Sequence, residues 1–240
     1  MKSVWAKVPS KWVQQAGLKK FRATAAGESA AALKLYMAVA MFANFKPSPA
    51  EKIAGVAKLS FSELENICGV SRQFVARGVA LLSSHGLIEV LKVGNANAYL
   101  LAGYDDLGWA KVPRAYLLDN GRFERLGIRG SLHLNALKLY LALTTFRENT
   151  SPRSLLSYDK IVEYTGMPRA SVRRSIDVLI NHEWISLASN SEGAGDTRPA
   201  NSYILRGDFW GKQRRTYARA LADAPTSAVA DDFGYGEIEI

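Results

Sequence analysis

The sequence contains a long internal repeat, and this repeat limits what the chain can fold into. Residues 5–9 read WAKVP and recur letter for letter as residues 109–113. Residues 32–36, ALKLY, recur as residues 136–140 at the same offset of 104. Collinear matches of this kind indicate two successive units of one architecture, each of a usual domain size.

The longest part of the repeat begins at Leu59 in the first copy and at Leu156 in the second. The segments that follow align without a gap at an offset of 97. Matched pairs include Gly69 and Gly166, Arg72 and Arg169, Val75 and Val172, Arg77 and Arg174, Leu82 and Leu179, and His85 and His182. The second copy therefore loses seven residues before this segment and regains them later, where residues 97–100 match residues 201–204.

Local signals in this segment predict two helices joined by a tight turn. A short helix over residues 62–68 ends at Gly69, because glycine adopts positive φ at little cost. Ser71 is placed to cap the second helix with its hydroxyl group. Three apolar residues of the second helix recur at i, i+4 and i+7 and predict a buried stripe: Val75, Val79 and Leu82.

The other face of the second helix is polar and carries small side chains. It presents Gln73, Ala76, Arg77 and Ala80. A helix with such a face can enter the major groove of DNA. The residues after it predict a strand over residues 87–90 and a polar hairpin tip over residues 92–97.

Longer helices precede the paired helices in both copies. The apolar spacing predicts them over residues 29–45 and about 135–147, and prolines mark connectors after each. Residues 46–58 read as such a connector. Residues 103–108 are short, so we expect the two copies to lie close together.

We therefore expect three parts. Residues 1–104 form the first domain and residues 105–208 the second. Residues 209–240 combine a basic helix up to about residue 223 with a disordered, acidic tail. The tip of the second hairpin, residues 189–200, is expected to be mobile.

The charge of the chain indicates a polyanionic partner. The formal net charge is +9 at pH 7. Residues 1–104 carry 13 Lys and Arg against 5 Asp and Glu, whereas residues 105–208 carry 14 against 12. The basic excess therefore lies mostly in the first copy, and a basic domain favours nucleic acid as a partner.

Composition also predicts the compartment. Cys68 is the single cysteine, so no internal disulfide can form and a reducing cytoplasm is expected. The chain has no apolar run of transmembrane length and no signal-peptide pattern at its first residues, so we expect no membrane contact. A basic protein of this kind is expected in the cytoplasm, associated with the nucleoid.

The paired helices followed by a hairpin resemble the winged helix-turn-helix. Two such units in one chain are typical of plasmid replication initiators and of regulators carried by mobile elements, and the resemblance covers about 200 of the 240 residues. It implies a mainly α protein with small β-wings, of α+β class, made of two tandem winged helix-turn-helix domains from an internal duplication.

The resemblance also implies which residues touch DNA. In winged helices the second helix reads base edges, and the wing lies along the backbone or the minor groove. The predicted contacts are Arg72, Gln73, Ala76, Arg77, Lys92, Asn95 and Asn97 in the first copy, and Arg169, Ala170, Arg173, Arg174 and Arg198 in the second. Asp177 stands where the first copy has Ala80. It would repel phosphate unless it accepts a hydrogen bond from cytosine or lies outside the groove.

Catalysis is not expected. The sequence has no phosphate-binding GxxxxGK[ST] loop, no Cys and His set with zinc spacing and no arrangement of Ser, His and Asp that indicates a nucleophile. His85 and His182 are better explained by their place near a helix C-terminus than by a metal. We predict no enzyme activity, no metal site and no cofactor.

The predicted function is sequence-specific binding of double-stranded DNA, as a transcriptional regulator of a plasmid or mobile-element operon. The alternatives are a plasmid or phage replication initiator that binds origin repeats, and a DNA-bridging, partition or protein-scaffold module. One chain carries two matched units, so it can act as a monomer with pseudo-twofold content or as a homodimer. The acidic end, residues 225–240, is either a solubilising tail or a contact for a host transcription or replication protein.

Overall fold

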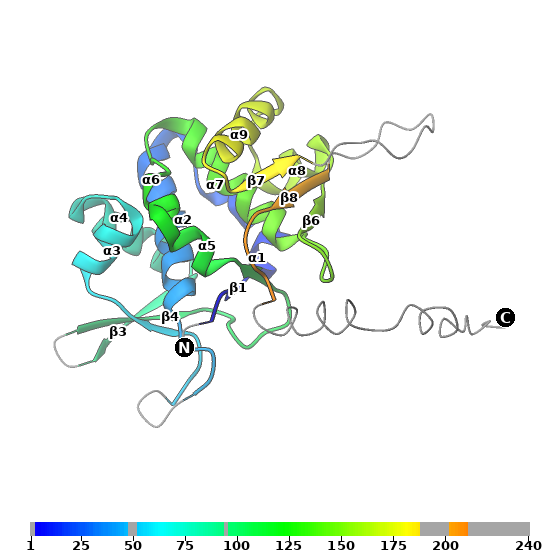
Figure 1. Cartoon of the computed structure of the whole chain (residues 1–240). Coiled ribbons are helices and arrows are strands. Elements are labelled where there is room, and N and C mark those ends of the chain that lie inside the picture. Colours follow the sequence, from blue (N-terminus) through cyan, green and yellow to red (C-terminus); the bar gives the residue numbers. More distant parts are fainter. Residues whose placement is uncertain (1–2, 48–51, 94–95, 188–201, 211–240) are drawn as a thin grey trace, which may run out of the picture. The chain divides into compact units, whose positions relative to one another are not determined.

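The computed structural model describes residues 3–47, 52–93, 96–187 and 202–210. It is a mixed structure of helices and small antiparallel sheets, in agreement with the expected α+β class (Figure 1). Met1–Phe209 form one compact unit. The expected basic helix after Trp210, the acidic tail and the second hairpin tip lie outside the described residues.

The first half of the compact unit contains these elements in chain order: β1 (Ala6–Pro9), α1 (Lys11–Gln14), the 3-10 helices η1 (Gly17–Lys20) and η2 (Ala23–Ala25), α2 (Ala26–Phe42), β2 (Val56–Lys58), α3 (Phe61–Cys68), α4 (Arg72–Ser84), β3 (Ile88–Val93) and β4 (Ala96–Leu101). Strands β2, β4 and β3 form an antiparallel sheet in that order.

The second half follows the same order: β5 (Trp109–Val112), α5 (Arg114–Leu118), the 3-10 helix η3 (Asp119–Gly121), α6 (Arg122–Arg125), α7 (Gly130–Thr145), β6 (Arg153–Leu155), α8 (Tyr158–Thr165), α9 (Arg169–Asn181), β7 (Ile185–Leu187) and β8 (Ser202–Leu205). Its sheet has the equivalent order β6, β8 and β7.

The two WAKVP segments pair with each other. Strands β1 and β5 form an antiparallel ribbon in which Lys7 lies opposite Lys111 and Ala6 opposite Val112. The register places Val8 opposite Ala110, so exchanging the two copies reproduces the same pairs. Trp5 and Trp109 stack at the ribbon with ring centroids 6.0 Å apart. The repeated segment therefore joins the halves as a self-complementary contact.

Helices α2 and α7 form the centre of the unit and pack against each other (Figure 1). Residues 29–41 of α2 and residues 134–144 of α7 are buried without a break. Such helices are covered on all sides rather than along one stripe. In α2 the cover comes from α4, α7, α3 and strands β1 and β2.

Each half also sends a segment across to the paired helices of the other half. We call residues 11–25 the first arm and residues 114–129 the second arm. The second arm contacts α3 through α6, and the first arm contacts α8 through η1. A Cβ atom at Gly69 would lie 2.7 Å from the Glu124 carbonyl oxygen, and one at Gly166 would lie 2.9 Å from Lys19 Cγ. The arms therefore rest against the turns that precede α4 and α9.

Two lysines at equivalent positions are buried in the centre. Lys34 Nζ donates hydrogen bonds to the carbonyl oxygens of Leu126 and Glu124, at 2.6 and 3.1 Å. Lys138 Nζ donates to the Thr165 carbonyl oxygen at 3.1 Å. Burial lowers the pKa of both lysines to about 8, because a charged amine is costly away from water.

Several expectations about local structure need correction. Helix α2 begins and ends three residues earlier than expected. It ends at Phe42 because Ala43 is extended and the Asn44 backbone amide donates a hydrogen bond to the Val56 carbonyl oxygen. Helix α7 likewise runs over Gly130–Thr145. The connector after α2 contains strand β2, whose partner β4 lies far along the chain. Ser71 occupies the N-cap of α4 but makes no capping hydrogen bond. Ser60 does cap α3, in a reciprocal capping box with Glu63.

We predict that Gly69→Ala destabilises the protein more than Gly86→Ala. Both glycines have positive φ, +60 and +67°, so alanine is strained at either by about 1–2 kcal/mol. Only Gly69 meets the second arm, whereas nothing lies within 4 Å of a Cβ at Gly86. Overpacking should add about 1–3 kcal/mol at Gly69. Urea denaturation measures both free energies of unfolding, and equal losses would show that the second arm does not press on this turn.

We also predict that the free energy of unfolding rises from about pH 8 to pH 9. The folded pKa of Lys34 and Lys138 is about 8, against 10.5 for a free lysine, so in this range the unfolded chain binds more protons at these two positions and raising the pH favours folding. Above pH 9 the Cys68 thiol, whose pKa burial raises to about 12, acts in the opposite direction. Denaturation across this range should show a smaller rise in Lys34→Met than in the wild type. The exposed Lys11→Met is the control, and a wild-type rise retained in Lys34→Met contradicts the assignment.

Candidate nucleic-acid interface

Helix α4 is held with one face against the core and the other toward solvent. Val75, Val79 and Leu82 are buried, as the spacing predicted. Gly78 brings α4 close to α2, because a Cβ there would lie 2.5 Å from Leu35 Cδ1. The predicted contact residues on the outer face are exposed: Arg72, Gln73, Ala76 and Arg77.

Helix α9 is arranged in the same way against α7. Val172, Ile176 and Leu179 are buried. The predicted residues Arg169, Ala170, Arg173 and Arg174 are exposed. Both helices thus present the expected side chains to solvent from equivalent places in the two halves.

The arginines at the two helix starts are held by matched contacts. The Arg72 guanidinium lies 5.3 Å from the centroid of the Phe61 ring, and the Arg169 guanidinium lies 5.8 Å from that of Tyr158. Each also has an acidic neighbour, Glu65 for Arg72 and Asp159 for Arg169. Exposed pairs of this kind are weak, so a phosphate can replace the carboxylate while the ring keeps the arginine in place.

Arg77 differs from the prediction in having a partner outside α4. Its guanidinium pairs with Glu28 at 2.8 Å, at the first turn of α2. About half of the Arg77 side chain is exposed, at 51%. The pair ties α4 to α2 and partly neutralises Arg77, so this arginine is less available to a base than the helical spacing alone suggested.

In α9 an ion pair accounts for Asp177. Arg173 Nε lies 3.1 Å from an Asp177 carboxylate oxygen, one helical turn away. Arg174 forms no ion pair with any residue that the structure describes, and it is exposed. Arg174 is therefore the cation on this face that an anionic partner meets without displacing a carboxylate.

The predicted wing residues are only partly described. Lys92 lies in β3 opposite Asn97 in β4, and strand pairing continues to Val93 and Ala96. The expected hairpin is present, but its tip does not span residues 92–97, because ladder pairing extends the strands to the residues flanking positions 94 and 95. Asn97 is half-buried. Asn95, Arg198 and the side chain of Lys92 lie outside the described part.

The first arm adds cations that the sequence did not place. Lys19, Lys20 and Arg22 are exposed and line a groove of about 520 Å³ with Glu28, Leu81 and His85. This groove runs beside the C-terminal half of α4. The basic run was visible in the sequence, but its place depends on the fold, which brings the arm beside α2 and the end of α4.

The two equivalent histidines are packed rings at the C-caps of α4 and α9. Phe21 meets His85 edge to face, with ring centroids 5.2 Å apart. Burial first, and then the charge of Lys20, lowers the pKa of His85. Burial also lowers the pKa of His182. Both histidines therefore stand at helix C-termini, as expected, and burial makes each ring hold a proton less readily than a free histidine.

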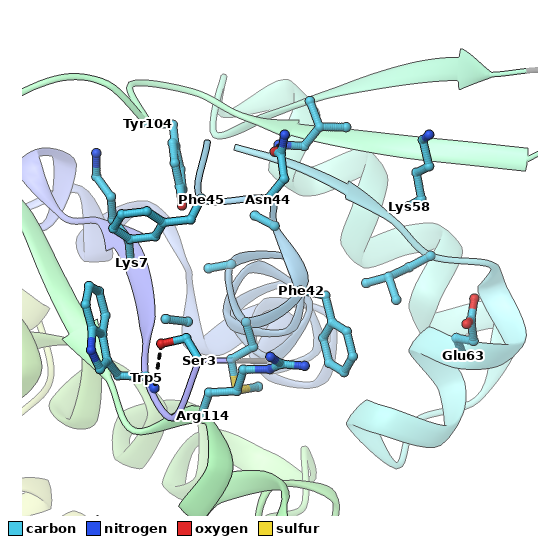
Figure 2. Close-up of a pocket in the computed structure, with 16 residues that line it drawn as sticks. Ser3, Trp5, Lys7, Phe42, Asn44, Phe45, Lys58, Glu63, Tyr104 and Arg114 are labelled. Carbon is cyan, nitrogen blue, oxygen red and sulfur yellow. Dashed lines mark hydrogen bonds between the residues drawn. The ribbon is translucent and has the colours of Figure 1, made fainter. Parts of the chain in front are cut away.

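A second concave site lies beside β1. It has a volume of about 440 Å³. Figure 2 shows Trp5, Lys7, Phe45 and Tyr104 along one side, Lys58 and Glu63 along the other, and Arg114 and Phe42 between them. We call it the ribbon cavity. The sequence did not predict it, because its lining comes from α2, β1, β2, α3 and the second arm.

The described residues offer neither the ligand cluster of a metal site nor a membrane-spanning helix. Among the described residues no group of three or more His, Cys, Asp or Glu side chains is placed to hold a metal ion. No helix in the described ranges is long and apolar enough to cross a membrane. The sequence matches no model of a known protein family, and no curated protein matches it significantly.

Proposed function

We propose that each half is a winged helix-turn-helix domain, that the two arose by duplication, and that the protein binds double-stranded DNA sequence-specifically. One observation carries the proposal. Helices α4 and α9 expose matched polar faces with arginines from equivalent positions, Arg72 with Arg169 and Arg77 with Arg174. Binding of a polyanion by both faces would explain why both halves carry arginines at these equivalent positions.

Bases would be read by Gln73 in the first turn of α4 and by Arg174 near the middle of α9. Gln73 suits adenine, and Arg174 suits guanine, through two hydrogen bonds each. The two helices carry different side chains at matched places, such as Ala76 and Arg173. The proposal therefore includes two half-sites of different sequence.

Backbone contacts would come from the helix starts and the first arm. Arg72 and Arg169 stand at the first residues of α4 and α9. Lys19, Lys20 and Arg22 extend the positive surface beside α4. Contacts of this kind position a protein on DNA without reading sequence and make binding dependent on salt.

Within this class we propose a transcriptional regulator of a plasmid or mobile-element operon, acting in the cytoplasm on the nucleoid. The same face would also serve a replication initiator. Selection of bound duplexes from a random library at physiological salt tests the proposal. A two-part motif beside a promoter supports the regulator, and arrays of the motif beside an AT-rich segment identify an initiator. Enrichment of no motif contradicts sequence-specific binding.

Arg174→Ala should weaken binding to the selected duplex by about 1–3 kcal/mol and relax one base position. Arg77→Ala should cost less, because Glu28 already holds its guanidinium. Titrations of selected and random duplexes measure both effects, with the exposed Arg206→Ala as the control. Equal losses on the two duplexes would assign Arg174 to a phosphate instead of a base.

Asp177→Ala should strengthen binding to random duplex DNA. The change removes a negative charge from the outer face and leaves Arg173 without its carboxylate partner. Position 177 then carries an alanine, as the equivalent position Ala80 does in the first half. The slope of log affinity against log salt should steepen by about one unit at most. Unchanged affinity and slope would place this end of α9 outside the DNA contact.

A further inference from the structure

The ribbon cavity contains an arginine that no carboxylate of the described residues pairs with. Arg114 is half-buried, and its guanidinium lies 4.7 Å from the centroid of the Phe42 ring. Its Nε is buried without a hydrogen-bond partner. Among the described residues Arg114 forms no ion pair. A partly desolvated arginine with unused donors gains most from an anion that offers several oxygen atoms, such as a phosphate.

One side of the cavity is aromatic and partly open to solvent. Trp5 and Phe45 meet edge to face with centroids 5.4 Å apart, and Phe45 is 51% exposed. Lys7 Nζ lies 4.6 Å from the Tyr104 ring centroid and keeps a positive charge beside this wall (Figure 2). Exposed rings next to cations are the features on which nucleobases stack in nucleic-acid-binding proteins.

The charge and size of the cavity fit a small organic anion. Its lining includes Lys7, Lys58 and Arg114 against the single carboxylate of Glu63. That carboxylate accepts hydrogen bonds from the Ser60 backbone amide and hydroxyl group, so it serves the start of α3. The volume of about 440 Å³ lies within the usual range of small-molecule sites, roughly 300–1,000 Å³.

The second half has a related cavity at the Trp109 side of the stacked tryptophans. It has a volume of about 380 Å³, and Trp109, Lys111, Thr144 and Thr145 line it. These residues are 104 positions from Trp5, Lys7, Ala40 and Met41 of the ribbon cavity. Arg147 adds a cation there. The ribbon thus has a basic cavity with a tryptophan wall in each half.

We propose that the ribbon cavity binds a nucleotide, with the phosphate on Arg114 and the base against Trp5 and Phe45. The proposal is independent of duplex binding by α4 and α9, because it uses none of their residues. The nucleotide has two sources, a free nucleotide or a unit of a single strand. A single strand can also reach the Trp109 cavity, so its affinity exceeds that of a mononucleotide and depends on Trp109.

The test uses the full chain and two probes, thymidine monophosphate and a short oligothymidylate. Tryptophan fluorescence and calorimetry measure binding. Arg114→Gln should weaken binding of the preferred probe about tenfold or more, since a charged hydrogen-bond partner is lost. Phe45→Ala should weaken it by a similar factor through lost stacking. Phe45 is exposed, so this variant keeps the test valid if Arg114→Gln misfolds.

Arg206→Ala is the control, and it should bind the probes as the wild type does. Equal affinity for the two probes assigns the site to a free nucleotide. Tighter binding of the oligonucleotide that falls in Trp109→Ala assigns it to a single strand. Absence of binding by the wild type, or binding that both Arg114→Gln and Phe45→Ala leave unchanged, overturns the proposal. Titrations of the same variants with duplex DNA test the proposed duplex binding separately from nucleotide binding in the ribbon cavity.

Discussion

The fold depends on the burial of α2 and α7 against each other. Each helix is apolar on all sides, and residues 29–41 and 134–144 are buried without a break. One half offers too few surfaces to cover such a helix, because its own paired helices and sheet reach only some of its sides. The other half supplies the remainder, and the β1–β5 ribbon closes the contact at one end. The two halves therefore share one core, although their sequences read as successive units.

Because the two halves share one core, the position of α4 relative to α9 is fixed. The turn at Gly69 rests on the second arm, and the turn at Gly166 rests on the first. Lys34 strengthens the same contact, since its amine binds carbonyl oxygens near the end of α6. The spacing of α4 and α9 is thus set by packed elements, and the link over residues 103–108 need not hold the halves in place. A DNA site read by both helices would have a fixed spacing for the same reason.

Sequence reasoning succeeded where the signals were local. Helices α3 and α4 follow from a turn glycine and a 3.6-residue apolar period, which act within a few residues. It failed where the partner is distant. Strand β2, which exists because it pairs with β4, was not predicted. The WAKVP segment was expected to be extended, but its pairing with its own copy was not predicted. The apolar spacing of α2 predicted a helix, but it did not predict that the second half would cover its remaining sides.

The difference between local and distant contacts also determines which surface arginines are free of a carboxylate partner. Spacing placed Arg77 and Arg174 on equivalent outer faces, yet only the fold brings Glu28 to Arg77. The Arg173–Asp177 pair was readable as an i, i+4 spacing, whereas the isolation of Arg114 depends on five elements meeting at one cavity. An arginine that already holds a carboxylate must exchange it before it binds a phosphate, and the exchange reduces the net gain. At Arg174 and Arg114, which form no ion pair in the described part of the chain, an anion binds without displacing a carboxylate.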